Sequence, residues 1–194
     1  MKRKSSRVIF LQGKKTVLRP ICKQTDLPSL TRWINDPEIR SFILIYQPQM
    51  FESEEQWLDA IANNKRPNDI ILAIETQDGR FIGTMGIHNI SWKDGTATTG
   101  AIIGEKAFWG KGYGSDAKMT LLDYAFNTLN LHKVCSAVIA YNERSLNYSL
   151  HCGYKIEGRK RQQIFKHGAY HDEILLGVFK EEWLAAKKKH EKKK

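Results

Sequence analysis

A cluster of glycines directly before an apolar segment is the strongest chemical signal in the sequence. Residues 107–126 read AFWGKGYGSDAKMTLLDYAF, with Gly110, Gly112 and Gly114 inside five residues and Lys111 among them. Glycines ahead of a helix allow backbone N–H groups to approach a ligand closely, and a phosphate is the usual ligand at a helix N-terminus. The pattern therefore predicts a loop that binds a pyrophosphate.

The spacing of these glycines excludes the two common nucleotide-binding loops. A Walker A motif has four residues between its first glycine and the Gly-Lys pair, whereas five residues separate Gly104 from Gly110. Gly112 also stands where that motif needs a serine or threonine. A dinucleotide fingerprint reads G-x-G-x-x-G near the first strand, but this chain has G-x-G-x-G late in its sequence. The phosphate ligand must belong to another class.

The elements that position this loop follow from hydrophobic periodicity. Helices are expected at residues 25–36, 53–64, 115–129 and 143–153, and strands at residues 16–20, 70–75, 81–87, 96–104, 134–140, 155–165 and 172–179. In the helix at 115–129 we expect Met119, Leu122, Phe126 and Leu129 to share the buried face. The order β-α-α-β-β-β-α-β-α-β-β predicts one α/β domain with a single mixed sheet.

The positive charge is concentrated at the two ends of the chain. The net charge is +10, but without residues 1–7 and 187–194 the chain has 21 basic and 20 acidic residues. We therefore expect a basic N-terminal segment at 1–13, a domain at 14–180 and a basic tail at 181–194. Such ends are usually solvated, and they would add weak, salt-sensitive contacts to a polyanion such as RNA or the ribosome.

The sequence gives no sign of export, membrane insertion or metal binding. The apolar run after the basic start is too short for a signal peptide, and no stretch approaches the roughly 20 apolar residues of a membrane span. Cys22, Cys135 and Cys152 are an odd number without metal-ligand spacing. Free thiols in a reducing cytoplasm are expected, with no metal and no membrane partner.

Two motifs resemble the GNAT superfamily of acetyl-CoA-dependent N-acetyltransferases. IIGEKAFWGKGYGSDA, residues 102–117, is similar to its acetyl-CoA loop, and YNERSLNYSLHCGYKIEG, residues 141–158, is similar to the helix that follows the next strand. Both occur in the expected order, and the similarity is nearest to ribosomal-protein alanine N-acetyltransferases, with spermidine acetyltransferases nearby. The resemblance implies an α/β fold with a mixed, mostly antiparallel sheet flanked by helices, and acetyl-CoA as co-substrate.

The resemblance also implies which residues bind acetyl-CoA. Ala101, Ile102 and Ile103 would pair with the pantetheine arm as an added strand does. The residues that would cradle the pyrophosphate are Trp109, Gly110, Lys111, Gly112, Tyr113, Gly114 and Ser115. Asn142 would hydrogen-bond a pantetheine amide, and Ser145 would cap its helix or touch the cofactor. Trp109 replaces the usual Arg or Gln, which a loop that binds through backbone N–H groups tolerates.

The catalytic residues depart from the family pattern. Relatives often place a tyrosine, the general acid, at the position of Ser149, a hydroxyl that would orient a water or donate weakly. Tyr148, one residue earlier and about 100° around the helix, is the candidate acid. The two positions that carry a glutamate base in relatives hold Thr98 and Ile164. His88, at a strand end, is the remaining candidate base. The sequence therefore predicts a hydroxyl-and-water mechanism without one indispensable base, in which His88→Ala costs less than about tenfold.

The missing glutamates bear on the acceptor. An α-amine with a pKa near 8 is about 250-fold more often neutral at pH 7 than a lysine-like amine near 10.4. A site without a carboxylate base therefore favours a protein N-terminus or a small primary amine. A spermidine-type acetyltransferase and a non-catalytic acyl-CoA-binding module remain as alternatives, and a homodimer is among the expected assemblies.

Overall fold

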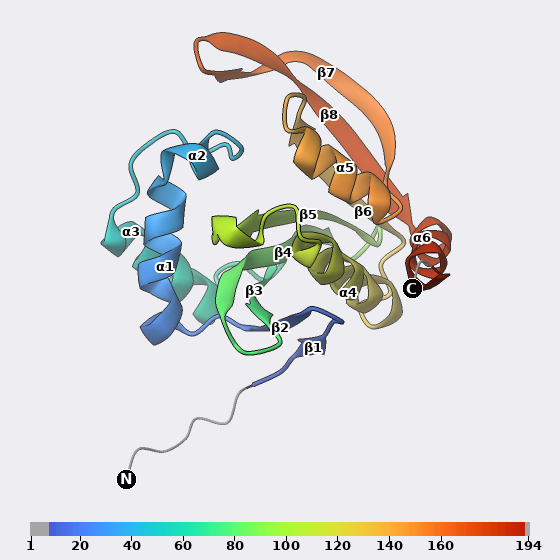
Figure 1. Ribbon diagram of the computed structural model, residues 1–194, viewed down its shortest axis with the longest axis horizontal. Coiled ribbons are helices and arrows are strands. Elements are labelled where there is room, and N and C mark those ends of the chain that lie inside the picture. Colours follow the sequence, from blue (N-terminus) through green and yellow to red (C-terminus); the bar gives the residue numbers. More distant parts are fainter. Residues whose placement is uncertain (1–7, 193–194) are drawn as a thin grey trace.

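The computed structural model describes residues 8–192 (Figure 1). Its strands are β1 Leu11–Gln12, β2 Thr16–Pro20, β3 Ile70–Thr76, β4 Phe81–Ser91, β5 Thr96–Ile103, β6 Lys133–Ile139, β7 Lys155–Lys166 and β8 Ala169–Phe179. Its helices are α1 Lys23–Asn35, α2 Pro37–Arg40, α3 Phe51–Ala62, α4 Tyr113–Asn127, α5 Glu143–His151 and α6 Lys180–Lys192, with a 3₁₀ turn at Lys106–Phe108. Of the expected basic segment at residues 1–13, residues 1–7 lie outside the described residues.

One sheet carries all eight strands, in the order β1-β2-β3-β4-β5-β6-β8-β7. Neighbouring strands are antiparallel except β5 and β6, which run parallel. That pair is short: it joins Thr96 with Lys133 and ends where Thr98 meets Cys135. Beyond this point the two strands diverge, and an opening forms in the middle of the sheet. The mixed, mostly antiparallel fold expected from the resemblance is confirmed.

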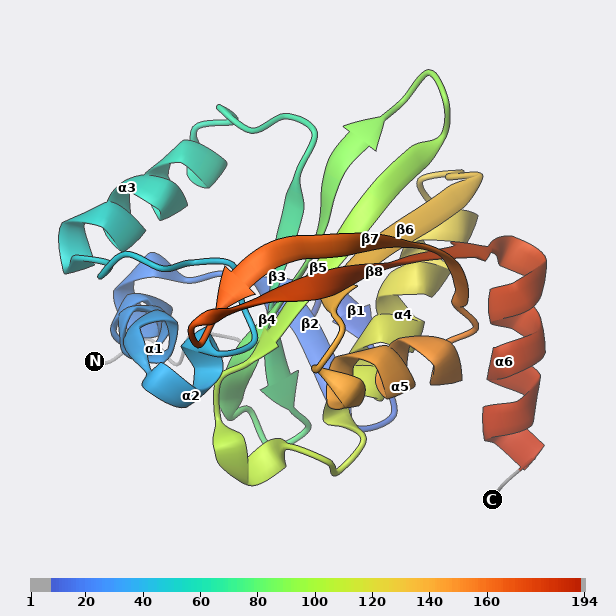
Figure 2. The ribbon, with the colours of Figure 1, turned by 90° about the horizontal axis from the view of Figure 1, so that it is seen from above.

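Helices cover the sheet in two groups, as Figures 1 and 2 show. Helix α4 packs its apolar face, including Leu121, Leu122 and Phe126, against the central strands in the larger core. Helices α1, α2 and α3 form a second core on the other face, around Leu27, Trp33 and other apolar side chains. The opening between β5 and β6 therefore lies between these two groups of helices.

Helix α4 differs from its expected register. It begins at Tyr113, two residues before the predicted start, with Gly112 in a left-handed conformation as its N-cap. The inward face carries Lys118 and Leu121 as well as Leu122 and Phe126, while Met119 is partly buried at the edge of the core. A lysine in this face breaks the apolar pattern, so periodicity alone could not find it.

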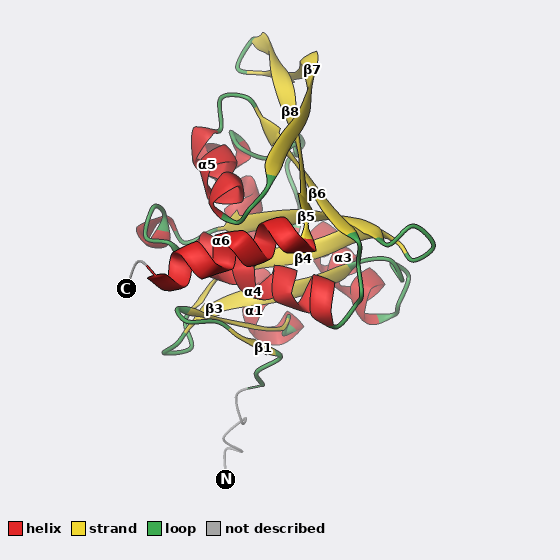
Figure 3. Ribbon diagram, turned by 90° about the vertical axis from the view of Figure 1, so that its right-hand side faces the viewer, coloured by secondary structure: helices red, strands yellow, loops and turns green. Residues whose placement is uncertain are grey.

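The chain beyond Phe179 belongs to the domain, which corrects the expected tail at 181–194. Residues 180–192 form α6, and Trp183 is fully buried in the larger core with its ring 5.7 Å from that of Phe126. Figure 3 shows α6 lying across this side of the molecule. The sequence did not predict this contact, because the segment is rich in lysine and a single tryptophan does not produce a helical hydrophobic period. At the other end, β1 extends the sheet before residue 14.

Candidate active site

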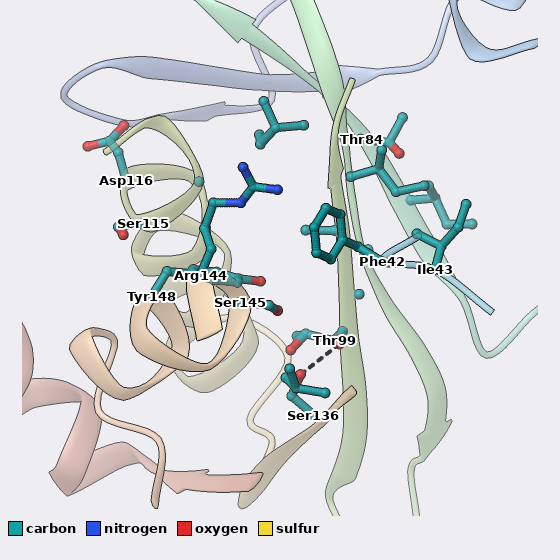
Figure 4. Close-up of a pocket in the computed structure, with 18 of the residues that line it drawn as sticks. Phe42, Ile43, Thr84, Thr99, Ser115, Asp116, Ser136, Arg144, Ser145 and Tyr148 are labelled. Carbon is teal, nitrogen blue, oxygen red and sulfur yellow. Dashed lines mark hydrogen bonds between the residues drawn. The ribbon is translucent and has the colours of Figure 1, made fainter. Parts of the chain in front are cut away.

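The diverging strands open a cavity of about 1780 Å³. Figure 4 shows side chains from the sheet, α4, α5 and the segment after α2 pointing into it. Among the residues expected to bind acetyl-CoA, those that line the cavity are Ala101, Ile102, Ile103, Trp109, Gly110, Gly112, Gly114, Ser115, Asn142 and Ser145. Lys111 and Tyr113 belong to the same loop without lining the cavity. The two sequence motifs thus meet at one site.

The glycine loop is shaped to receive a phosphate group. Gly110 and Gly112 have φ angles of +70° and +83°, which favour glycine, and a Cβ at Gly110 would meet no atom within 4 Å. No side chain caps the start of α4, and Asp116 is the first residue there whose N–H bonds back to the loop, at the Gly112 carbonyl. Unpaired N–H groups at a helix start attract an anion. The loop therefore fits the pyrophosphate of acetyl-CoA.

A lysine from the N-terminal turn joins this loop. Lys15 Nζ donates to the Lys111 carbonyl at 3.0 Å and lies 3.6 Å from the space that a Cβ on Gly112 would fill. The Asp116 carboxylate holds the turn in place, because it accepts hydrogen bonds from the N–H groups of Lys14, Lys15 and Thr16. A basic side chain beside the phosphate loop went unnoticed in the sequence, since nothing local links residues 15 and 112.

The opposite wall comes from α5. The Asn142 side-chain oxygen caps this helix by accepting from the Ser145 N–H at 3.1 Å. Its amide NH₂ group has no acceptor among the described residues, so it remains available for a ligand carbonyl. Both residues line the cavity, and Ser145 is the N–H donor of the cap rather than the capping side chain.

An aromatic and cationic stack crosses the cavity. The Arg144 guanidinium lies 3.8 Å from the Trp109 ring centroid and 5.1 Å from that of Phe42, and Figure 4 shows Arg144 and Phe42 approaching each other. Trp109 Nε1 donates to the Ile103 carbonyl at 2.6 Å. A pantetheine arm that pairs with Ile103 through this carbonyl has to share it with the indole or displace the indole. Trp109 therefore does more here than replace the usual Arg or Gln.

The two hydroxyl candidates on α5 lie on different sides. Tyr148 lines the cavity. Ser149 is fully buried, is not part of the cavity wall, and its hydroxyl has no partner among the described residues. The structure thus separates Ser149 from the site and leaves Tyr148 at it.

His88 reaches the point where the strands part. It pairs with Thr98 across β4 and β5, and its ring lies over Gly86 and Gly100, whose missing side chains leave room for it. A Cβ on Gly100 would lie 3.5 Å from His88 Nε2. Nδ1 lies 3.8 Å from an Asp69 carboxylate oxygen. Burial lowers the pKa of His88 below its usual value despite the opposing effect of Asp69, so the ring is neutral at pH 7.

A buried carboxylate in the same cavity was missed by the sequence analysis. Glu54, in the first turn of α3, lines the cavity with an exposed fraction of 8%. Its side chain makes no hydrogen bond or ion pair with the described residues. Burial raises the pKa of this carboxyl. Glu54 looked like one of several acids at a helix start, and only the packing of α3 distinguishes it from Glu55.

Two kinds of site are not found in this part of the chain. Residues 8–192 contain no group of His, Cys, Asp and Glu side chains that could hold a metal ion. No helix within them has the length and apolar character to cross a membrane.

A split sheet with a phosphate loop beside the opening defines a CoA-dependent acyltransferase, and comparison with known proteins identifies the family. The GNAT acetyltransferase domain matches residues 15–155. YoaA of Bacillus subtilis (strain 168), named as an uncharacterised N-acetyltransferase, is 28% identical over 88% of this chain and 97% of its own length. YdaF of the same organism, provisionally named a ribosomal N-acetyltransferase, is 32% identical over 55% of this chain and 57% of its own.

A solved structure supports the fold. The spermidine N-acetyltransferase of Vibrio cholerae, crystallised with CoA and spermine, superposes with a TM-score of 0.79 at 24% identity, covering 88% of this chain and 98% of that one. The chain therefore belongs to the GNAT acetyltransferase family. It is an acetyl-CoA-dependent N-acetyltransferase that transfers an acetyl group to an amine.

Proposed function

We propose that the acceptor is an amine with a single positive charge, such as a protein N-terminus or a small primary amine. The observation that carries this proposal is Glu54, a buried carboxylate without a partner in the cavity. An unpaired buried carboxylate costs free energy, and a bound ammonium group would offset that cost. Glu54 would hold the amine before transfer.

The other carboxylates around the cavity are already engaged. Asp116 binds the N-terminal turn, Asp123 pairs with Lys187, and Glu173 pairs with Lys160 at 3.0 Å. Within residues 8–192, Glu54 is thus the one carboxylate of the cavity wall that has no hydrogen bond or ion pair. A polyamine would bring two or more cationic groups, for which this wall offers a single partner. This count favours a monocation over spermidine. Spermidine is the second candidate because the V. cholerae protein of similar fold is a spermidine N-acetyltransferase.

The geometry supports a direct transfer. The phosphate loop follows Ile103, so an arm that runs back along β5 brings its thioester toward Thr99, where the strands part. His88 lies beside this point with its pKa lowered, and we infer that it takes the proton of the amine. The nitrogen then attacks the thioester carbonyl, the C–N bond forms, and the C–S bond breaks with its electron pair on sulfur.

The test compares Glu54→Gln with Glu55→Gln, the same change at a neighbouring residue that pairs with Lys23 and does not line the cavity. Steady-state rates are measured with an N-terminal peptide, a small primary amine and spermidine. We expect Glu54→Gln to raise KM for the monoamines at least about tenfold, the worth of roughly one charged hydrogen bond. KM for acetyl-CoA should stay unchanged, and Glu55→Gln should match the wild type. Spermidine as the best acceptor, or unchanged amine KM in Glu54→Gln, would contradict the proposal.

A further inference from the structure

A lysine is fully buried behind the point where β5 and β6 diverge. Lys118 comes from α4 and has no exposed surface. Its Nζ donates to Thr99 Oγ1 at 2.7 Å, and it lies 5.2 Å and 5.1 Å from the ring centroids of Tyr148 and Tyr154. A lysine this deep is rare unless a carboxylate pairs with it. Its position next to the reacting end of the cavity suggests a role.

No carboxylate balances this charge within residues 8–192. The titratable groups that face Lys118 are Tyr148, Tyr154 and Cys152, with His88 farther away. Burial raises the pKa of Tyr154 and that of Cys152 each to about 12, so both are neutral at pH 7. Burial disfavours the ammonium form of Lys118, but Thr99 Oγ1 accepts a hydrogen bond from it and the Tyr148 and Tyr154 rings face it, and the net effect is a raised pKa. The point beyond Thr98 and Cys135 where β5 and β6 diverge, here called the vertex, therefore holds a positive charge that no described carboxylate balances.

The hydrogen bond from Lys118 to Thr99 links the ammonium to a network that joins β5 and β6 at the vertex. Thr99 Oγ1 accepts from Lys118, lies 2.8 Å from the Tyr154 hydroxyl and donates to the Cys135 carbonyl at 3.3 Å. Ser136 Oγ reaches the Thr99 carbonyl at 3.4 Å (Figure 4). Thr99 and Ser136 are the first residues after the last β5–β6 pair, and both line the cavity. The ammonium thus lies directly behind the cavity wall.

The direction of acetyl-CoA places its sulfur at the same point. The pyrophosphate loop lies beyond Ile103, and an arm that pairs with β5 runs back toward Thr99. Acetyl transfer leaves negative charge on that sulfur when the C–S bond breaks. A preorganised charge in a water-poor site stabilises such developing charge strongly.

We propose that Lys118 is a positioning residue whose ammonium, held behind Thr99 and beside Tyr148, is the counter-charge of the departing CoA thiolate. The amine nitrogen forms its bond to the carbonyl carbon, the electron pair of the C–S bond stays on sulfur, and the proton of the amine passes to His88. The thiolate then lies in front of the ammonium until it is released. The inference rests on the placement of acetyl-CoA in the cavity and not on the identity of the acceptor.

The direct test measures the ionisation of the thiol of bound CoA. Ultraviolet thiolate absorbance is followed against pH for CoA bound to the wild type, Lys118→Met and Lys118→Arg. We expect the wild type to ionise the thiol of bound CoA at a lower pH than the thiol of free CoA measured under the same conditions. Lys118→Met should move this titration upward by about one pH unit, a tenfold change, and Lys118→Arg should restore much of the shift.

Kinetics and stability separate this role from a structural one. Lys118→Met should lower kcat about 10- to 100-fold with less than a threefold change in KM for acetyl-CoA, and it should bind desulfo-CoA as the wild type does. Its thermal midpoint should not fall, because the substitution removes an unpaired buried charge and keeps most of the volume. Should Lys118→Met fail to fold, Thr99→Val, which removes the hydrogen bond at Nζ, should move the thiol titration in the same direction. An unchanged thiol titration in a folded variant overturns the proposal.

Discussion

The position of His88 leads us to propose a different mechanism from the one that its sequence context suggested. Thr98 and Ile164 at the usual glutamate positions, with Ser149 at the usual tyrosine position, predicted a mechanism without one indispensable base. In that mechanism His88→Ala has a small effect. The structure instead places this ring over Gly100, at the first part of β5 that is free of β6. The small residues that make room for it lie on adjacent strands, so their relation depends on register and is invisible in the chain order.

We therefore expect His88→Gln to lower kcat/KM by about 100-fold or more, in the range of general-base catalysis. The wild-type rate should fall as pH drops through the pKa of His88, which burial places below the usual 6.5, because the protonated ring cannot accept a proton. The pH profile is measured with two acceptors of different pKa. An acidic limb that stays in place with both amines and disappears in His88→Gln supports the base. If the acidic limb instead shifts with the pKa of the amine, and kcat/KM of His88→Gln falls by less than tenfold, the result contradicts a base role for His88 and supports the mechanism without a base.

At the scale of elements, the sequence predicted those parts of the site that are contiguous. The glycine loop with α4 and the Asn142 helix both carry local signals, namely glycines with positive φ and a side-chain cap. Lys15, Glu54 and Lys118 were not predicted. Lys15 arrives through the β1–β2 turn, Glu54 through the packing of α3, and Lys118 interrupts an otherwise apolar face. Tertiary contacts bring each of the three to the site, and neither the composition nor the hydrophobic periodicity of the sequence predicts such contacts.

Helix α6 gives the element-scale prediction. Trp183→Ala should lower the free energy of unfolding by about 3 to 5 kcal/mol, the usual cost of emptying a buried tryptophan site. Leu184→Ala, one residue later and 38% exposed, is the matched control and should cost less than about 1 kcal/mol. Denaturant unfolding monitored by circular dichroism measures both. Equal small losses in the two variants would show that α6 is not anchored in the core and would restore a domain end near Lys180.

At the scale of the whole molecule, the sheet consists of two parts with a narrow junction. The strands β1 to β5 and the strands β6, β8 and β7 share one short parallel ladder that ends at Thr98 and Cys135. The Thr99 and Ser136 hydroxyls add hydrogen bonds at its end. Acetyl-CoA would contact β5 and the phosphate loop on one wall and Asn142 on the other. The substrate is then part of what holds the two walls at a fixed distance.

Binding should consequently stabilise both walls together. At 100 times its Kd, acetyl-CoA should add about 2.7 kcal/mol to the free energy of unfolding, which raises the thermal midpoint by roughly 5 to 11 °C in a chain of this size. Hydrogen exchange should slow in residues 99–103 and in residues 136–142 over the same range of ligand concentration. Gly112→Asp serves as the control, because a carboxylate in the phosphate loop repels the pyrophosphate and should abolish both effects while the fold persists. Protection confined to one wall, or an equal thermal shift in Gly112→Asp, would show that acetyl-CoA does not bridge the split sheet.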